Sequence, residues 1–232
     1  MKNTTLKGLI DKLNKKPVHE NIFLRPISSN VKYAKVWLDK ITPQDNIVSP
    51  GGPYEFYFIT NDQGFYVATV LDMYSDLHWF VLPAFRKKGY LTKALTETIL
   101  PHLFQKDSRE TQRITIDNGF LGQKDFIASE KVALKIGFKK TEEQEKEYIL
   151  SSEPFTNHNY IDGENTKLSE ERIKILTKRI NYIARSLWLV QNEVEMSMGD
   201  LDYAEDLKEL VSEVKRHTII LEDKWYENNR RN

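Results

Sequence analysis

The sequence predicts an α+β protein, in which a mixed and mainly antiparallel sheet flanked by helices is followed by an all-α helical hairpin. Short runs of β-branched and aromatic residues alternate with amphipathic helical runs as far as residue 152. After residue 166 the apolar residues recur three and four positions apart, which is the spacing of paired helices. We therefore expect a helical arm (1–20), an α+β domain (21–152), a linker (153–166) and a helical hairpin (167–232).

Each element of the α+β domain has a local signal. Ser28 or Ser29 can cap a helix after the first strand, Asn61–Gly64 suits a hairpin turn, and Gly137 suits the end of a helix. Proline and glycine mark Thr42–Pro53 as a loop. The expected strands are 22–27, 54–60, 65–74, 77–82, 113–117 and 146–151, and the expected helices are 28–41, 90–104 and 126–137.

The C-terminal region carries two apolar seams. Its first helix begins at Ser169, the pattern breaks at Ser197–Asp200, and Asp200 is the expected N-cap of the second helix. Large apolar residues outside the seams need a further surface, and we expect a homodimer through these helices to supply it. The seams are Ile173, Leu176, Ile180, Ile183, Leu187, Val190 and Val194, then Ala204, Leu207, Val211, Val214, Thr218, Leu221 and Trp225, and the residues outside them are Trp188, Leu189, Leu210, Ile219 and Ile220.

Composition limits the classes of protein to which this chain can belong. Lys plus Arg and Asp plus Glu each number 34, so the net charge is zero, which makes nucleic acid an unfavourable partner. The chain has no cysteine, which excludes disulfides and thiolate chemistry. No stretch approaches the ~20 apolar residues of a membrane span, and the N-terminal residues lack the apolar run of a signal peptide. We expect a cytoplasmic protein that does not act at a membrane.

The stretch PAFRKKGY (Pro83–Tyr90) joins an apolar strand to a helix. A helix N-terminus offers unpaired N–H groups to an anion, Gly89 lets a ligand approach the backbone, and Arg86, Lys87 and Lys88 add positive charge. These features suit a pyrophosphate, and the strand edge before them suits an extended ligand with amide groups. A nucleotide diphosphate with an amide-bearing arm describes coenzyme A.

RKKGYL (Arg86–Leu91) and ASEKVALKIGFKK (Ala128–Lys140) are two motifs in order, each in a fitting local structure. The first resembles the Arg/Gln-x-x-Gly-x-Gly/Ala motif of the GCN5-related N-acetyltransferases, the GNAT family, and the second resembles that family's later helix, which closes on Lys-x-Gly-Phe. The order of the expected elements extends the resemblance over 21–152. The strand that leads into a proline, an aromatic residue, an arginine and a glycine also resembles the branch that acetylates ribosomal-protein N-termini. It implies a GNAT-like, acyl-CoA-binding domain that transfers acetyl from acetyl-CoA to a primary amine. The cofactor contacts that it implies are Phe80, Val81, Arg86, Lys87, Lys88, Gly89, Tyr90, Leu91 and Ser129.

The resemblance also indicates where the chemistry takes place. The strand before Pro83 faces the acceptor in the family, and His78 and Asp76 are the titratable residues there. His78 suits a general base, while the alternatives are a solvent-facing strand residue for His78 and a turn residue for Asp76. N–H groups near Val81 would polarise the thioester carbonyl. Solvent or another side chain would protonate the coenzyme A thiolate. Ser129 is the nearest such side chain, or else a residue of the helix surface.

Three positions depart from the family's pattern. Leu91 replaces the second small residue of the first motif and is expected to crowd the pyrophosphate loop, Phe126 aligns with an Asn, and Ala133 aligns with a Tyr that often acts as general acid. Cofactor binding is therefore better supported than catalysis. The alternative is a GNAT-fold binding or regulatory module with weak or no catalysis, which acts through its helical hairpin. A toxin acting on aminoacyl-tRNA is a third possibility, which the neutral charge disfavours.

The sequence does not identify the amine acceptor, so both a small molecule and a peptide remain possible acceptors. We expect no metal ion, because the histidines show no metal-ligand spacing. The histidines considered are His19, His102, His158 and His217.

Overall fold

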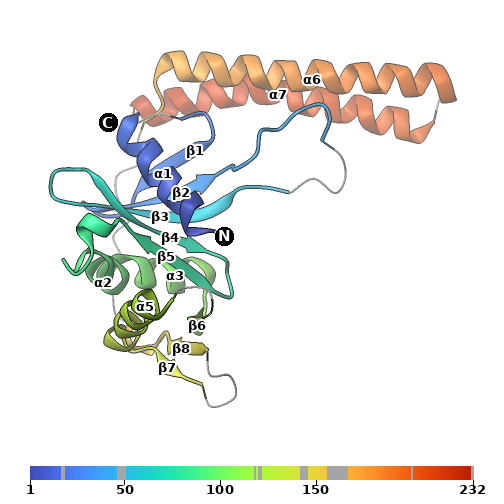
Figure 1. Ribbon diagram of the computed structural model, residues 1–232. Coiled ribbons are helices and arrows are strands. Elements are labelled where there is room, and N and C mark those ends of the chain that lie inside the picture. The colour runs from blue at the N-terminus through green and yellow to red at the C-terminus, as the bar shows by residue number, and fades with distance from the viewer. Residues whose placement is uncertain are drawn as a thin grey trace. The chain divides into compact units, whose positions relative to one another are not determined.

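The computed structural model describes residues 1–16, 19–45, 51–117, 119, 122–141, 146–155, 167–199 and 201–230. The chain divides into two compact units, Met1–Asn165 and Thr166–Asn232. The α+β class is confirmed, because the first unit combines an antiparallel five-stranded sheet with helices and the second is a pair of helices (Figure 1). Part of the loop Thr42–Pro53, most of the linker 153–166 and the expected cap Asp200 lie outside the described residues.

Five antiparallel strands form the main sheet, and each pairs with the strand before it in the chain. The turn after the third strand follows the prediction, because the side-chain oxygen of Asn61 accepts hydrogen bonds from the backbone N–H groups of Gln63 (3.1 Å) and Phe65 (2.9 Å). Gly64 closes this turn with a φ of 78°, which glycine adopts at little cost. The strands are β1 (Ile22–Pro26), β2 (Val31–Val36), β3 (Tyr54–Thr60), β4 (Tyr66–Asp72) and β5 (Leu77–Val81).

The helix predicted at 28–41 is wrong, because residues 31–36 form strand β2. The N–H of Ile27 donates to the carbonyl of Val31 (3.0 Å), and Ser28 Oγ donates to the side-chain oxygen of Asn30 (3.1 Å), so the expected capping serine belongs to a tight turn. β2 then pairs with β1 on one side and β3 on the other. Pairing on both edges satisfies the strand's backbone groups, and this decides between a helix and a strand in a segment whose local sequence fits both.

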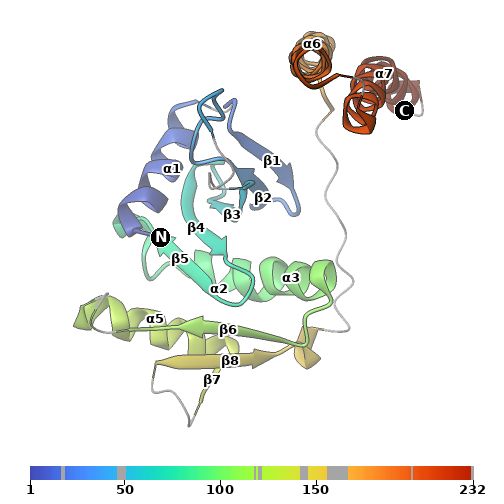
Figure 2. The same cartoon turned by 90° about the vertical axis from the view of Figure 1, so that its right-hand side faces the viewer.

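Helix α1 (Asn3–Lys15) packs against one face of the main sheet (Figure 2). Its apolar residues recur at helical spacing and are buried among side chains of that face, including Phe56, Phe58 and Phe80. The N-terminal arm is therefore part of the folded first unit. The buried residues of α1 are Leu6, Leu9, Ile10 and Leu13.

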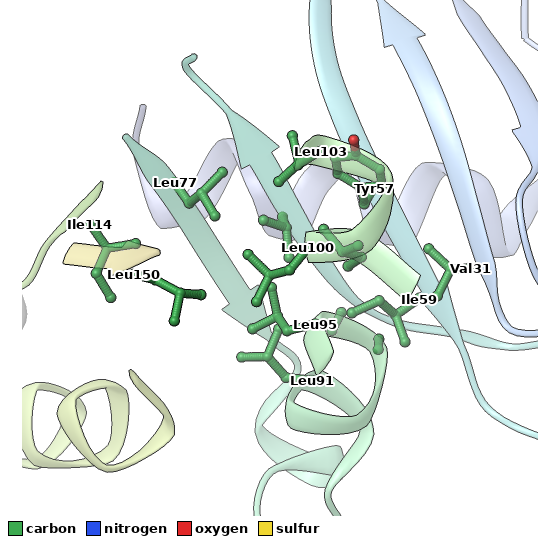
Figure 3. Close-up of a cluster of buried hydrophobic side chains, with 14 of the residues drawn as sticks. Val31, Tyr57, Ile59, Leu77, Leu91, Leu95, Leu100, Leu103, Ile114 and Leu150 are labelled. Atoms are coloured by element: carbon green, nitrogen blue, oxygen red, sulfur yellow. The ribbon is translucent and has the colours of Figure 1, made fainter. Parts of the chain in front are cut away.

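A continuous helical segment packs on the other face. It comprises α2 (Tyr90–Ala94), a π-helical turn η2 (Leu95–Ile99) and α3 (Leu100–Asp107). Pro101, which cannot donate an intrahelical hydrogen bond, follows the wider π turn. Figure 3 shows side chains from this segment and from the sheet pointing toward one another in one hydrophobic cluster. The labelled members are Val31, Tyr57, Ile59, Leu77, Leu91, Leu95, Leu100, Leu103, Ile114 and Leu150.

A second, three-stranded antiparallel sheet completes the first unit. Its strands are ordered β6 (Thr111–Thr115), β8 (Glu147–Ser151) and β7 (Lys139–Lys140). Helix α5 (Gln123–Ile136) ends as predicted at Gly137, whose φ is 110°. Short 3₁₀ turns occur at Pro83–Phe85 (η1) and Glu153–Phe155 (η3).

A buried ion pair joins the two sheets. Arg109, next to the start of β6, donates from Nη1 to one carboxylate oxygen of Asp72 (3.0 Å) and from Nη2 to the other (2.7 Å), and Asp72 ends β4. Nη1 also donates to the carbonyl of Tyr74 (2.9 Å). A two-pronged guanidinium–carboxylate contact is geometrically selective, so it sets where the second sheet begins relative to the first.

The second unit consists of α6 (Glu170–Met198) and α7 (Asp202–Arg230), which lie side by side (Figure 1). Ser169 caps α6 as predicted, with Oγ accepting from the N–H of Arg172 (3.2 Å). The seam of α7 is confirmed at its buried positions, Ala204, Leu207 and Val211. No helix in the described part of the chain is long and apolar enough to cross a membrane.

The seam predicted for α6 needs a correction at two positions. Ala184 and Gln191 are buried, whereas Ile183 and Val190 are 54% and 49% exposed. The small side chain of Ala184 lets the two helices approach closely. Ala184 and Gln191 therefore take the places in the seam that were predicted for Ile183 and Val190. The displaced apolar side chains then lie beside the seam.

Candidate functional site

The outer edge of β5 has backbone groups that no neighbouring strand uses. The N–H of Leu82 donates to the carbonyl of Val67 on β4 (2.9 Å). Alternate residues of an antiparallel strand face opposite edges, so the N–H groups of Trp79 and Val81 point away from β4. β5 is the last strand of its sheet, and within the described residues no strand pairs with this edge. It therefore has donors and acceptors available for an extended ligand.

Asp76 ties the start of β5 to the end of β6. Its Oδ1 accepts hydrogen bonds from the N–H groups of Leu77 and Thr115, both at 2.9 Å. Beyond this tie the two edge strands diverge (Figure 2). These contacts give Asp76 a structural role at the closed end of the edge, away from Val81.

The loop after β5 leads into a helix N-terminus that no side chain caps. Gly89 occupies the N-cap position with a φ of 84°, and its carbonyl accepts the first helical bond from the N–H of Lys93 (2.9 Å). The N–H groups of the residues between them precede the first intrahelical bond. Lys87, with a φ of 62°, and Lys88 are exposed beside this N-terminus. The arrangement places positive charge and backbone donors together.

Arg86 connects this loop to α5. Its Nη1 donates to Oδ1 of Asp125 (2.8 Å) in the first turn of α5, and its Nε donates to the carbonyl of Val81 (3.3 Å). Ser129 lies four residues after Asp125 and so shares its helix face. The side chain of Ser129 is half-buried on that face. The geometry thus brings Val81, the basic loop and Ser129 to one end of the unit.

Two predicted contact residues point elsewhere. The side chain of Phe80 is buried with α1 on the far face of the sheet, so only its backbone belongs to the β5 edge. Leu91 is buried in the large hydrophobic cluster and points inward (Figure 3). Its side chain therefore does not crowd the loop as the sequence led us to expect. Tyr90 packs partly against the same cluster.

His78 lies near the tied end of β5. Its Nε2 is 3.0 Å from the side-chain oxygen of Asn3, so this nitrogen carries the proton when the imidazole is neutral. Burial lowers the pKa of His78 below its ordinary value, and the N-terminal ammonium group lowers it further, while Asp76 opposes the shift. A neutral imidazole near pH 7 leaves Nδ1 as a proton acceptor. His78 is three residues from Val81, or about 10 Å along an extended strand.

Tyr148 is a buried hydroxyl beside α5. It donates to Oε1 of Glu130, and burial, together with that carboxylate, raises its pKa to about 12. Ala133, one turn further along α5, is also fully buried. The tyrosine proton is thus held inside the core, and Ser129 stays the nearest predicted donor on this helix.

An aromatic cluster lies beside the basic loop, and sequence reasoning missed it. Phe85 stacks on Phe65 with ring centres 5.8 Å apart, contacts the edge of Tyr90 at 6.3 Å, and has the ammonium group of Lys88 5.0 Å above its ring. Phe65 is 42% exposed. Phe85 within PAFRKKGY was a signal, but its partner Phe65 comes from a distant hairpin turn and only the fold brings them together.

Among the described residues, no group of three His, Asp or Glu side chains is placed to hold a metal ion. Comparison of the chain with protein-family models, with curated proteins and with solved structures found no match.

Proposed function

We propose that the first unit is an acetyl-CoA-dependent N-acetyltransferase of the GNAT type, which transfers acetyl to the primary amine of a small molecule or a peptide. The observation that carries the proposal is the order of features from Val81 to Tyr90. A free strand edge is followed by a basic loop and then by an uncapped helix N-terminus. An extended ligand with amides at one end and a diphosphate at the other fits that order.

The proposed contacts follow from the backbone. The first N–H groups of α2 would bind the pyrophosphate, with Lys87 and Lys88 adding charge. The amide-bearing arm would run along the β5 edge, and the N–H of Val81 would donate to the thioester oxygen, where negative charge develops. The inward direction of Leu91 leaves the loop open to a phosphate.

The exposed aromatic cluster supports the nucleotide half of the ligand. A planar base gains about 1–3 kcal/mol by stacking on an aromatic ring. Phe65 offers such a ring, and Lys88, which lies over the ring of its stacking partner Phe85, would attract a further phosphate. Phe65 thus becomes a proposed binding residue in addition to those predicted from the sequence.

The proposed chemistry is direct acyl transfer. The amine nitrogen bonds to the acetyl carbon, the carbon–sulfur bond breaks, and the amine loses a proton while the thiolate gains one. His78 is neutral near pH 7 and would accept the amine proton through a chain of water molecules, because about 10 Å separates it from Val81. Ser129 would donate to the thiolate, and solvent would restore its proton.

A second candidate function is acyl-CoA binding without transfer. The burial of Ala133 and the retention of the Tyr148 proton by Glu130 favour it, because neither position supplies an acid to the thiolate that acyl transfer releases. The binding site is the same in both functions, so affinity alone does not separate them.

The test is calorimetric titration of the whole chain with acetyl-CoA, coenzyme A and acetyl-pantetheine. We expect micromolar binding of the first two and at least tenfold weaker binding of acetyl-pantetheine, which lacks the diphosphate. No binding of acetyl-CoA at hundreds of micromolar contradicts both candidate functions. An amine-acceptor screen with detection of the released thiol then separates transfer from binding alone.

A further inference from the structure

Helix α6 carries a second apolar face that α7 does not cover. Four large residues recur every seven positions along it, with exposed fractions of 46%, 68%, 72% and 83%. Seven residues are close to two helical turns, so these side chains form one stripe over about 32 Å. A row of this length on a surface helix is larger than scattered apolar exposure. The residues of this outer stripe are Ile175, Tyr182, Leu189 and Met196.

A charged row separates the outer stripe from a second apolar row. Ile183 and Val190, the residues displaced from the seam, form that second row. The row between them is basic toward the N-terminus of α6, polar at its centre and acidic toward the C-terminus. It consists of Arg172, Arg179, Ser186 and Glu193.

We infer that this face of α6 binds the same face of a second copy of the chain, antiparallel, with the two-fold axis between residues 182 and 183. In this register Arg172 lies opposite the second copy's Glu193. The two-fold axis places each apolar row against the same row of the second copy, so Ile175 lies beside the second copy's Leu189. Val190 likewise lies beside the second copy's Leu176, which the hairpin buries only in part. A two-fold interface must be self-complementary, and this register meets that condition for both charge and apolar contact.

The charges along the whole hairpin favour the same direction. The half nearer the α6–α7 connection, 186–213, contains eight acidic residues and one lysine. The other half, 168–185 with 214–230, contains nine Lys and Arg against five Asp and Glu. Antiparallel pairing places each acidic half on a basic half, whereas parallel pairing places like charges together. The outcome is a four-helix bundle with α6 at its centre.

The first test measures mass in solution for the full chain by analytical ultracentrifugation. We expect a dimer at tens of micromolar, a monomer for Leu189→Glu, and a dimer for the matched control Asn192→Glu, which adds the same charge on an adjacent exposed row. Equal helix content by circular dichroism shows that both variants fold. A monomeric wild type overturns the proposal, as does a Leu189→Glu variant that stays dimeric.

The second test uses the absence of cysteine in the chain. Ile183→Cys adjoins the two-fold axis and should form a disulfide between copies under mild oxidation. Met196→Cys lies about 40 Å from its counterpart in the antiparallel register, so it should not. Cross-linking at both positions would indicate parallel pairing and overturn the proposed register.

The third test reverses the charges of the Arg172–Glu193 pair. Arg172→Glu and Glu193→Arg should each weaken the dimer several-fold, and the double variant should recover most of the affinity because the pair is restored with opposite sense. Single variants without effect, or a double variant that is weaker than either single one, would overturn the pairing.

Discussion

Gly89 adopts a backbone conformation that only glycine reaches without strain, at the position where we propose that a phosphate binds. A Cβ at this position meets no atom within 4 Å, so Gly89→Ala costs only backbone strain of roughly 1–2 kcal/mol. The same Cβ would project toward a bound pyrophosphate. We expect acetyl-CoA affinity to fall about tenfold, which corresponds to about 1.4 kcal/mol, as measured by titration calorimetry.

Gly137→Ala is the matched control for that variant. Gly137 also has a positive φ, 110°, but it ends α5, about 21 Å along the helix axis from its first turn. Both variants should lose similar stability in urea, and only Gly89→Ala should lose affinity. Equal affinities for the two variants would place the cofactor elsewhere.

His78 provides a pH prediction. Its pKa in the folded protein is below the ordinary value of 6.5, so the unfolded chain binds the proton more readily. Its contribution to stability is therefore complete above pH 6.5 and is lost as the pH falls through the folded-state pKa. The difference in unfolding free energy between wild type and His78→Gln should decrease over that interval, as measured by urea titration. Gln keeps a donor toward Asn3, so a pH-independent difference would mean that the imidazole is not held neutral.

At the level of strands, two substitutions of Asp76 distinguish a structural role of its side chain from a catalytic role. Asp76→Asn keeps an oxygen that accepts from Leu77 and Thr115, whereas Asp76→Ala removes both hydrogen bonds, at a cost of about 0.5–1.5 kcal/mol each. We expect Asn to preserve thermal stability and turnover, and Ala to lower the melting temperature. A well-folded Asn variant without turnover would restore Asp76 as the base.

The contact between the loop and α5 predicts a gain in binding. Asp125 is paired with Arg86 in the absence of ligand. Asp125→Asn removes the competing carboxylate, so Arg86 becomes available to a phosphate and acetyl-CoA should bind several-fold more tightly. Arg86→Gln should weaken binding in the same titration. If Asp125→Asn instead weakens binding, the pair is needed to position α5.

Local sequence patterns predicted most helices and strands of this chain, because in those segments the local preference agrees with the packing of the folded protein. Val31, Tyr33 and Val36 fit a helix and a strand about equally, and partners on both edges, which the local sequence does not contain, decided for β2. The seam of α6 failed for a similar reason. Ile183 is the more apolar residue, yet the close approach of α7 favours the small Ala184.

At the scale of the whole molecule, the site combines neighbours in sequence with residues that only folding brings together. The basic loop and Gly89 are contiguous, and so the sequence was sufficient to locate them. The pairing of Arg86 with Asp125 and the stacking of Phe65 on Phe85 span long separations along the chain. His78 and Asp76 were selected by residue type, and only their contacts with Asn3, Leu77 and Thr115 distinguish them.

The division into two units predicts that binding and association are separable. Both hydrophobic clusters of the first unit consist of its own residues, so a chain that ends at Asn165 should fold. It should bind acetyl-CoA within about twofold of the full chain's affinity and sediment as a monomer, because the proposed dimer surface lies on α6. The full-length Leu189→Glu variant is the control, since it should lose the dimer and keep the hairpin. If the truncated chain loses acetyl-CoA while Leu189→Glu retains it, the hairpin itself supports the binding site. If both lose it, the binding site requires the dimer.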